Sequence, residues 1–119
     1  MVMFFKHSEH FSRSEFACHC GCGSDTMDYE TVQILEDLRA WANAAIRVNS
    51  GFRCPDWNAY VGGAKNSWHM KGRACDIYIA TKTPEEIYNY LTLTYPNTYG
   101  IIRYDTFTHI DTRPQKWRG

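Results

Sequence analysis

The stretch NSWHMKGRACD, residues 66–76, places a histidine seven residues ahead of an aspartate, with a glycine between them. His69 and Asp76 are too far apart to share one helical turn, so they meet only if the chain turns at Gly72 and continues as a strand. The run ACDIYI, residues 74–79, favours such a strand because it is rich in β-branched and aromatic residues. An unpaired carboxylate inside a strand is energetically costly. Asp76 therefore needs a partner, and a bound cation is a good candidate.

The composition predicts a globular protein. At 119 residues the chain fits one domain spanning 1–119, with 44% hydrophobic and 15% aromatic residues. Its formal net charge of zero gives no electrostatic argument for binding nucleic acid or a membrane surface. We therefore expect neither as a partner, and we expect a monomer.

The N-terminal run MVMFFKHSEHF, residues 1–11, lacks the basic and apolar regions of a secretory signal. No apolar run approaches the length of a membrane span. We expect a soluble protein that is cytoplasmic as synthesised.

Apolar periodicity and capping signals predict an α+β fold with a mainly antiparallel sheet packed with helices. The expected helices cover 28–45 and 84–93, and the expected strands cover 46–49, 74–79, 100–104 and 107–112. The last two strands form a hairpin in the simplest interpretation. A loop over 51–72 separates the first two strands, and connections of that length are usually functional or disordered.

A second histidine of interest lies in the last expected strand, in the run FTHIDTR. Strand alternation places His109 and Asp111 on one face. His69, Asp76 and His109 together offer two imidazoles and a carboxylate. Three such ligands with a fourth position open to water are typical of a catalytic zinc site, which favours metal-assisted hydrolysis. The alternative is a purely structural set of buried His and Asp side chains.

Two runs of the chain resemble the zinc D-Ala-D-Ala carboxypeptidase family. They are SGFRCPDWNAYVGGAKNSWHMKGRACDI, residues 50–77, and FTHIDTRP, residues 107–114. Relatives in that family include vancomycin-resistance dipeptidases, phage endolysin peptidases and the Hedgehog signalling domain. Its pattern Ser-x-His-x-x-Gly-x-Ala-x-Asp, followed later by a histidine, is matched without a gap by Ser67, His69, Gly72, Ala74, Asp76 and His109.

The resemblance extends from residue 11 to about residue 117 and is greatest to a small branch with a Cys-Gly-Cys-Gly run near its N-terminus. It implies a Hedgehog-like α+β fold and a zinc-dependent peptidase of peptidoglycan stem peptides that contain D-amino acids. Either carboxypeptidase or endopeptidase action fits. A phage or prophage enzyme released onto the cell wall and a bacterial cytosolic protein both remain open.

The resemblance also implies roles for individual residues. His69, Asp76 and His109 correspond to the ligands of Zn²⁺. Arg53 corresponds to the arginine of the family's SG-aromatic-R segment, where a fixed charge binds the substrate carboxylate or steadies the oxyanion. Ser67 is expected to contact substrate near the metal.

The sequence departs from the family at the general base. Many relatives carry a glutamate three residues before the last zinc histidine, where this chain has Thr106. Asp111 is the first substitute because it shares the face of His109, and Asp105 is the second. Asp111 also fits two other roles: an acceptor that orients the imidazole of His109, or a partner of Arg113. The missing glutamate keeps a second function open, a cell-wall-binding or interaction module that keeps a metal without turnover.

Three aromatic residues lie in the long loop: Trp57, Tyr60 and Trp68. We expect at least one to line the substrate groove, and assign Trp68 to substrate binding. The alternative is that they fasten the loop to the body of the protein.

Five cysteines, an odd number, argue against a disulfide framework. Cys18, Cys20 and Cys22, together with His19, are candidates for a second, structural zinc, but their spacing is tighter than that of usual thiolate pairs. We therefore expect reduced thiols in a turn. Cys54 and Cys75 flank the proposed site and could pair if oxidised. We expect no such disulfide, because Cys75 should face away from Asp76 and cytosolic thiols are normally reduced.

Overall fold

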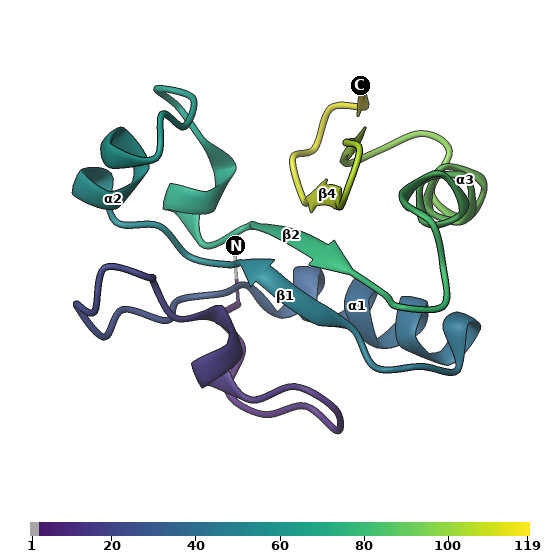
Figure 1. Cartoon of the computed structure of the whole chain (residues 1–119), viewed down its shortest axis with the longest axis horizontal. Coiled ribbons are helices and arrows are strands. Elements are labelled where there is room, and N and C mark those ends of the chain that lie inside the picture. The colour runs from purple at the N-terminus through teal and green to yellow at the C-terminus, as the bar shows by residue number, and fades with distance from the viewer. Residues whose placement is uncertain (1–2) are drawn as a thin grey trace.

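The structure is a computed structural model that describes residues 3–119. Its elements in chain order are η1 (Arg13–Phe16), α1 (Tyr29–Ala42), β1 (Arg47–Ser50), α2 (Pro55–Tyr60), η2 (Trp68–Lys71), β2 (Ala74–Tyr78), α3 (Pro84–Thr94), β3 (Gly100–Arg103), β4 (Thr108–Asp111) and β5 (Trp117–Arg118) (Figure 1). The fold is α+β, as predicted.

The five strands form one mixed sheet in the order β1-β2-β4-β3-β5. All neighbours are antiparallel except β3 and β5, which run parallel. The expectation of a mainly antiparallel sheet is confirmed, and β3 and β4 pair as the predicted hairpin. The short strand β5 was not predicted.

Local capping explains where the two long helices begin. Asp28 caps α1, its carboxylate accepting from the Thr31 backbone N–H. Thr83 and Glu86 form a capping box at the start of α3. Helix α1 stops before the predicted residue 45, because Asn43 takes a left-handed conformation with φ of 49°.

The segment 51–72 is not a structureless loop, which corrects the prediction made from its Gly, Pro and Asn content. Helix α2 begins there because Pro55 occupies its first turn and the Cys54 thiol accepts from the Trp57 N–H. The second helical piece, η2, ends at Gly72. The two helical pieces α2 and η2 position the residues that precede β2.

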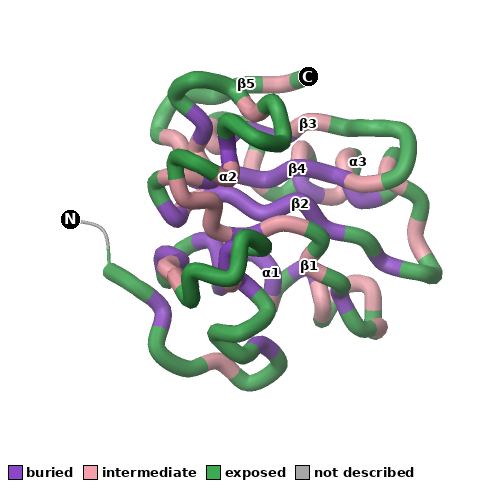
Figure 2. Tube along the Cα trace, turned by 60° about the vertical axis from the view of Figure 1, so that its left-hand side comes forward, coloured by how far each residue is buried: buried purple, intermediate pink, exposed green. Residues whose placement is uncertain are grey.

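The two faces of the sheet differ in character. Side chains such as Ile77, Ile101 and Ile110 point into a core that they share with α1 and α3. Strands β2 and β4 are the buried centre of the molecule (Figure 2). Because side chains alternate along a strand, Asp76 and His109 point to the opposite face. The core thus fixes the strands that carry the polar residues.

Among residues 3–119, no helix has the length and apolar character needed to cross a membrane.

Candidate metal centre and cleft

Strand pairing places Asp76 and His109 directly opposite each other. The two residues are register partners on β2 and β4. On either side of them, Ser50 pairs with Asp76 and Ile102 pairs with His109. One row across the sheet therefore carries two of the three predicted metal ligands.

The third predicted ligand, His69, is brought to this row by the turn at Gly72. The Ser67 hydroxyl accepts from the His69 N–H at 3.2 Å and starts η2. Gly72 ends it with φ of 68°, and a side chain there would also collide with the backbone of Thr26. The turn predicted at Gly72 is confirmed.

The three side chains converge around one carboxylate oxygen. His109 Nδ1 lies 2.8 Å and His69 Nε2 lies 3.3 Å from Asp76 Oδ1. One ligand atom from each residue lies within 4.8 Å of the others. Ligand atoms about 2.1 Å from a tetrahedral zinc ion lie about 3.4 Å from one another. Small shifts of the three side chains would therefore let their donor atoms surround one ion.

The far nitrogens of both imidazoles are held by the protein. His69 Nδ1 lies 2.8 Å from the Gly51 carbonyl oxygen, and His109 Nε2 lies 2.8 Å from Asp111 Oδ2. Each far nitrogen donates to its acceptor when the near nitrogen serves as a ligand. Histidine ligands almost always make such a bond, which fixes both ring orientation and tautomer.

Asp111 is fully buried behind His109. Arg113 Nε and Nη2 donate to its two oxygens at 2.8 and 2.6 Å, and the Gly100 N–H donates at 3.2 Å. A side chain at position 100 would collide with this pair, so glycine is required there. Burial alone would raise the pKa of Asp111, but the bonds from Arg113 and His109 hold that pKa well below its usual range.

These contacts differ from the first expectation for the general base. Asp111 lies on the side of His109 away from Asp76, and it is not among the residues that line the cleft. Asp105 is exposed in the turn between β3 and β4 and does not line the cleft either. Among the described residues, Asp76 is the only carboxylate that lines it.

Arg53 lies beside the three converging residues. Its Nη2 donates to Asp76 Oδ2 at 3.3 Å, Nε to the Ser50 hydroxyl at 3.2 Å and Nη1 to Asn58 Oδ1 at 3.3 Å. Burial would raise the pKa of Asp76, but hydrogen bonds with His109 and His69 hold it well below its usual range. Asp76 is thus an ionised carboxylate beside a fixed positive charge.

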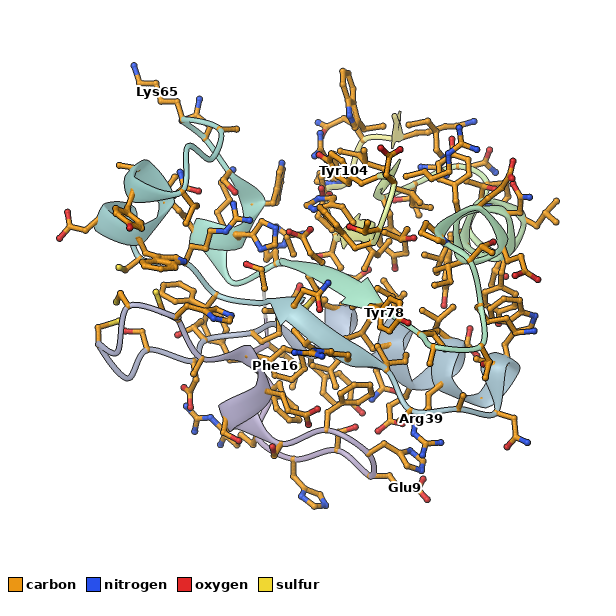
Figure 3. The ribbon with its side chains drawn as sticks, viewed as in Figure 1. Glu9, Phe16, Arg39, Lys65, Tyr78 and Tyr104 are labelled. Carbon is orange, nitrogen blue, oxygen red and sulfur yellow. The ribbon has the colours of Figure 1, made fainter. Side chains whose placement is uncertain are left out.

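A cleft of about 380 Å³ opens over this group. Its walls come from segment 61–64, η2, and the β3–β4 hairpin that carries Tyr104. In Figure 3, Tyr104 lies on this hairpin, and Lys65 lies at the outer end of the loop after α2. Ser67 and Trp68 line the cleft, whereas Trp57 and Tyr60 stack on each other outside it.

A family model described as peptidase M15 matches residues 9–111. The chain belongs to the peptidase M15 family. Members are metal-dependent hydrolases of peptides, so the predicted kinship with D-Ala-D-Ala carboxypeptidases is confirmed. The matched part of this M15 peptidase contains His69, Asp76 and His109. A comparison with curated proteins gave no match.

Sequence reasoning missed three residues that shape the site of this M15 peptidase, of which Tyr104 and Phe107 line the cleft and Asn58 does not. Asn58 is buried and holds Arg53, while Tyr104 stacks on Phe107 with ring centroids 4.5 Å apart. The sequence does contain a signal for the aromatic pair, because Tyr104 and Phe107 flank the hairpin turn predicted at 105–106. The sequence contains no such signal for Asn58, because only the packing of α2 turns its amide toward Arg53.

Proposed function

We propose that this M15 peptidase is a zinc-dependent hydrolase of peptidoglycan stem peptides that contain D-amino acids, acting on the cell wall after release. The observation that carries the proposal is the convergence of two imidazoles and one ionised carboxylate at the base of a cleft. The donor set is the one that catalytic zinc sites use.

In this proposal His69, His109 and Asp76 would hold the ion through Nε2, Nδ1 and Oδ1, respectively. A zinc ion bound there would polarise a peptide carbonyl and lower the pKa of water, which supplies the chemistry of hydrolysis. Gly51 and Asp111 keep the two imidazoles in the ligating tautomer through their far nitrogens.

Arg53 is the proposed anchor for negative charge on the substrate. Its guanidinium lines the cleft and is held by Ser50 and Asn58 in one orientation. A planar guanidinium binds a carboxylate through paired hydrogen bonds, as the C-terminus of a stem peptide would require, or it stabilises charge developing on the carbonyl oxygen. Ser67 and Trp68 are the proposed contacts for the peptide beside it.

We propose Asp105 as the proton acceptor and Asp111 as a positioning residue. Asp105 is exposed in the turn between Tyr104 and Phe107, both of which line the cleft, and the proposal requires this turn to move so that its carboxylate reaches the cleft. Asp111 is engaged by Arg113 and His109 and has no such freedom.

Replacing each aspartate by asparagine separates these roles. Asp111→Asn is expected to weaken metal binding about 10- to 100-fold, because outer hydrogen-bond partners of histidine ligands have effects of that size. Asp105→Asn is expected to leave metal affinity unchanged and to lower kcat about 10²- to 10⁴-fold. Metal affinity by competition with a chelator dye and kcat at saturating zinc measure the two effects. Full kcat in Asp105→Asn would exclude it as the base.

A second candidate function is a metal-stabilised cell-wall-binding module without turnover. The supporting observations are Thr106, where many relatives carry glutamate, and the absence of any carboxylate other than Asp76 along the described cleft lining. Such a module would use the same ligands and the same cleft for recognition.

Incubation with purified peptidoglycan and with a D-Ala-D-Ala peptide decides between the two. We expect new amino termini or released D-alanine, loss of that release with a chelator, and recovery with added Zn²⁺. A zinc-loaded protein that binds the sacculus but cleaves no muropeptide would establish the binding module instead.

A further inference from the structure

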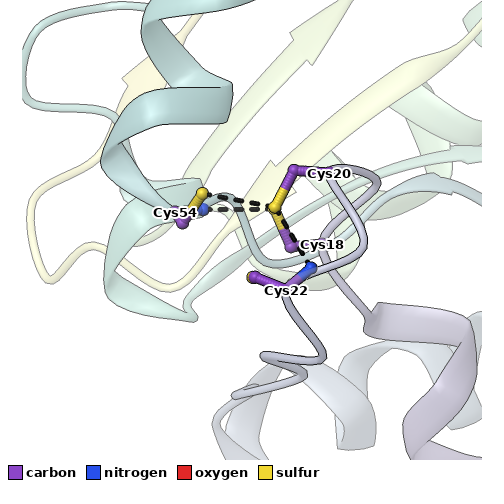
Figure 4. A group of neighbouring side chains, drawn as sticks. All are labelled: Cys18, Cys20, Cys22 and Cys54. Atoms are coloured by element: carbon purple, nitrogen blue, oxygen red, sulfur yellow. Dashed lines mark hydrogen bonds between the residues drawn. The ribbon is translucent and has the colours of Figure 1, made fainter.

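A second group of potential ligands lies apart from the cleft and consists of four cysteines. Cys18, Cys20 and Cys22 come from the N-terminal loop after η1, and Cys54 is the residue that caps α2 (Figure 4). Their sulfur atoms all lie within 4.8 Å of one another. The Sγ atoms of Cys18 and Cys20 are 3.5 Å apart, and those of Cys20 and Cys54 are 3.6 Å apart.

We propose that these four cysteines, the thiol cluster, bind a structural zinc ion. Four thiolates about 2.3 Å from a tetrahedral zinc lie about 3.8 Å apart, close to the separations seen here. A disulfide would require sulfurs about 2.05 Å apart. All five cysteines in the described part of the chain are free, and Cys75 lies elsewhere, against Met27. A zinc ion with four thiolate ligands has no coordination position left for water, which is typical of a structural rather than a catalytic site.

The backbone around the cluster is arranged to accept thiolate charge. The N–H groups of Cys22, Cys54 and Trp57 point at Sγ atoms of the cluster at 3.3 to 3.4 Å. Such bonds to sulfur offset the negative charge that four thiolates bring to one ion. Gly21 and Gly23 both adopt φ of 85°, a conformation that turns the chain tightly enough to bring three alternate cysteines to one point.

The ligand set differs from the one considered from sequence. His19 does not join the cluster, since its ring stacks on Trp57 with centroids 6.3 Å apart. Its place is taken by Cys54, which lies 34 residues beyond Cys20. Cys54 thus completes a four-thiolate set that the tight spacing of the first three cannot form alone.

An ion in the thiol cluster would brace the segment that supports the cleft. The Phe52 N–H donates to the Phe16 carbonyl, and a side chain at Gly51 would collide with the Phe16 backbone, so the two segments run in close contact. Gly51 in turn holds His69, and Arg53 directly precedes Cys54. The proposed structural site therefore ties the N-terminal loop to the residues that orient one cleft ligand and the cleft arginine.

Cobalt substitution of the whole protein tests the thiol cluster without reference to peptide cleavage. Thiolate-to-cobalt charge-transfer absorption is expected from the cluster but not from His69, Asp76 and His109, which contain no sulfur. His69→Ala should keep this absorption, and Cys54→Ser should lose it. Metal analysis of zinc-loaded protein should give two ions per chain, falling to one in either variant.

A second test measures thiol reactivity in the wild-type protein, so it can be used even if Cys54→Ser does not fold. Cys20 and Cys22 are exposed, so a disulfide reagent modifies them rapidly unless they ligate a metal. We expect protection in zinc-loaded protein and rapid modification after chelation. The proposal is overturned if cobalt gives no charge-transfer absorption, if zinc does not protect these thiols, or if mass spectrometry of freshly purified protein finds a disulfide within the cluster. These outcomes leave the proposed peptidase function untouched, because it depends on a different set of ligands.

Discussion

The variant His69→Ala is expected to lose the cleft metal and to lower kcat/KM at least a thousandfold. His69 supplies one of three converging ligand atoms, and its far nitrogen is already fixed by the Gly51 carbonyl. A catalytic metal contributes several kcal/mol to stabilising the transition state, and a loss of about 4 kcal/mol corresponds to roughly a thousandfold in rate. Metal content and steady-state cleavage of a D-Ala-D-Ala peptide measure the two losses.

The matched control for this variant is His7→Ala, which removes an exposed imidazole far along the chain from the three ligands. It should retain full metal content and activity. A His69→Ala protein that folds, as judged by its circular dichroism, and still cleaves at the wild-type rate would refute the ligand assignment. Added Zn²⁺ at high concentration should restore little activity, since Asp76 and His109 alone offer only two ligands.

The variant Arg53→Ala is expected to lower kcat/KM about 10²- to 10³-fold, the usual effect of removing one donor to developing negative charge. Arg53 forms an ion pair with Asp76, and Ser50 and Asn58 hold its guanidinium at the cleft. Arg53→Lys should recover only part of the loss, because an ammonium group cannot make the paired hydrogen bonds of a guanidinium. Peptide kinetics measured at saturating zinc avoid confusion with weaker metal binding.

How the loss divides between kcat and KM identifies the role of Arg53. A rise in KM with unchanged kcat indicates that it binds the substrate carboxylate, whereas a fall in kcat indicates that it acts on the transition state. Arg103→Ala is the control, since Arg103 is exposed and pairs with Glu85 on the surface. If Arg53→Ala and Arg103→Ala behave alike, the proposed role of Arg53 fails.

The order of the two long helices and of strands β1 to β4 could be predicted because local signals agree with the final fold. The capping residues Asp28 and Thr83 start the two long helices, and the β-branched runs form β2 and the hairpin. Alternation also gave the correct face for His109 and Asp111, since period-2 geometry holds for any strand. The prediction of a loop over 51–72 was wrong because it rested on the Gly, Pro and Asn content of this segment, which does not distinguish a loop from short capped helices.

The side-chain contacts of the candidate site were harder to predict from the sequence than the order of the helices and strands. Strand alternation placed Asp111 beside His109, and the alternatives of an acceptor for His109 and a partner for Arg113 are both seen in the structure, but the sequence could not indicate that the Gly100 N–H also donates to this carboxylate. Likewise, no spacing rule connects Cys54 with the run at 18–22, because the two segments are distant in sequence and are brought together only by folding, where Phe52 pairs with Phe16 and Cys54 contacts Cys18.

The sequence by itself determined the family and the α+β class and singled out His69, Asp76 and His109 as candidate metal ligands, because a motif and a strand pattern are local properties of the chain. Only the tertiary structure decided which nitrogen of each imidazole faces Asp76, where Asp105 and Asp111 lie relative to the cleft, and which cysteine joins the thiol cluster. These features depend on the register of β2 with β4 and on packing between segments distant in sequence, and both are set by the core as a whole.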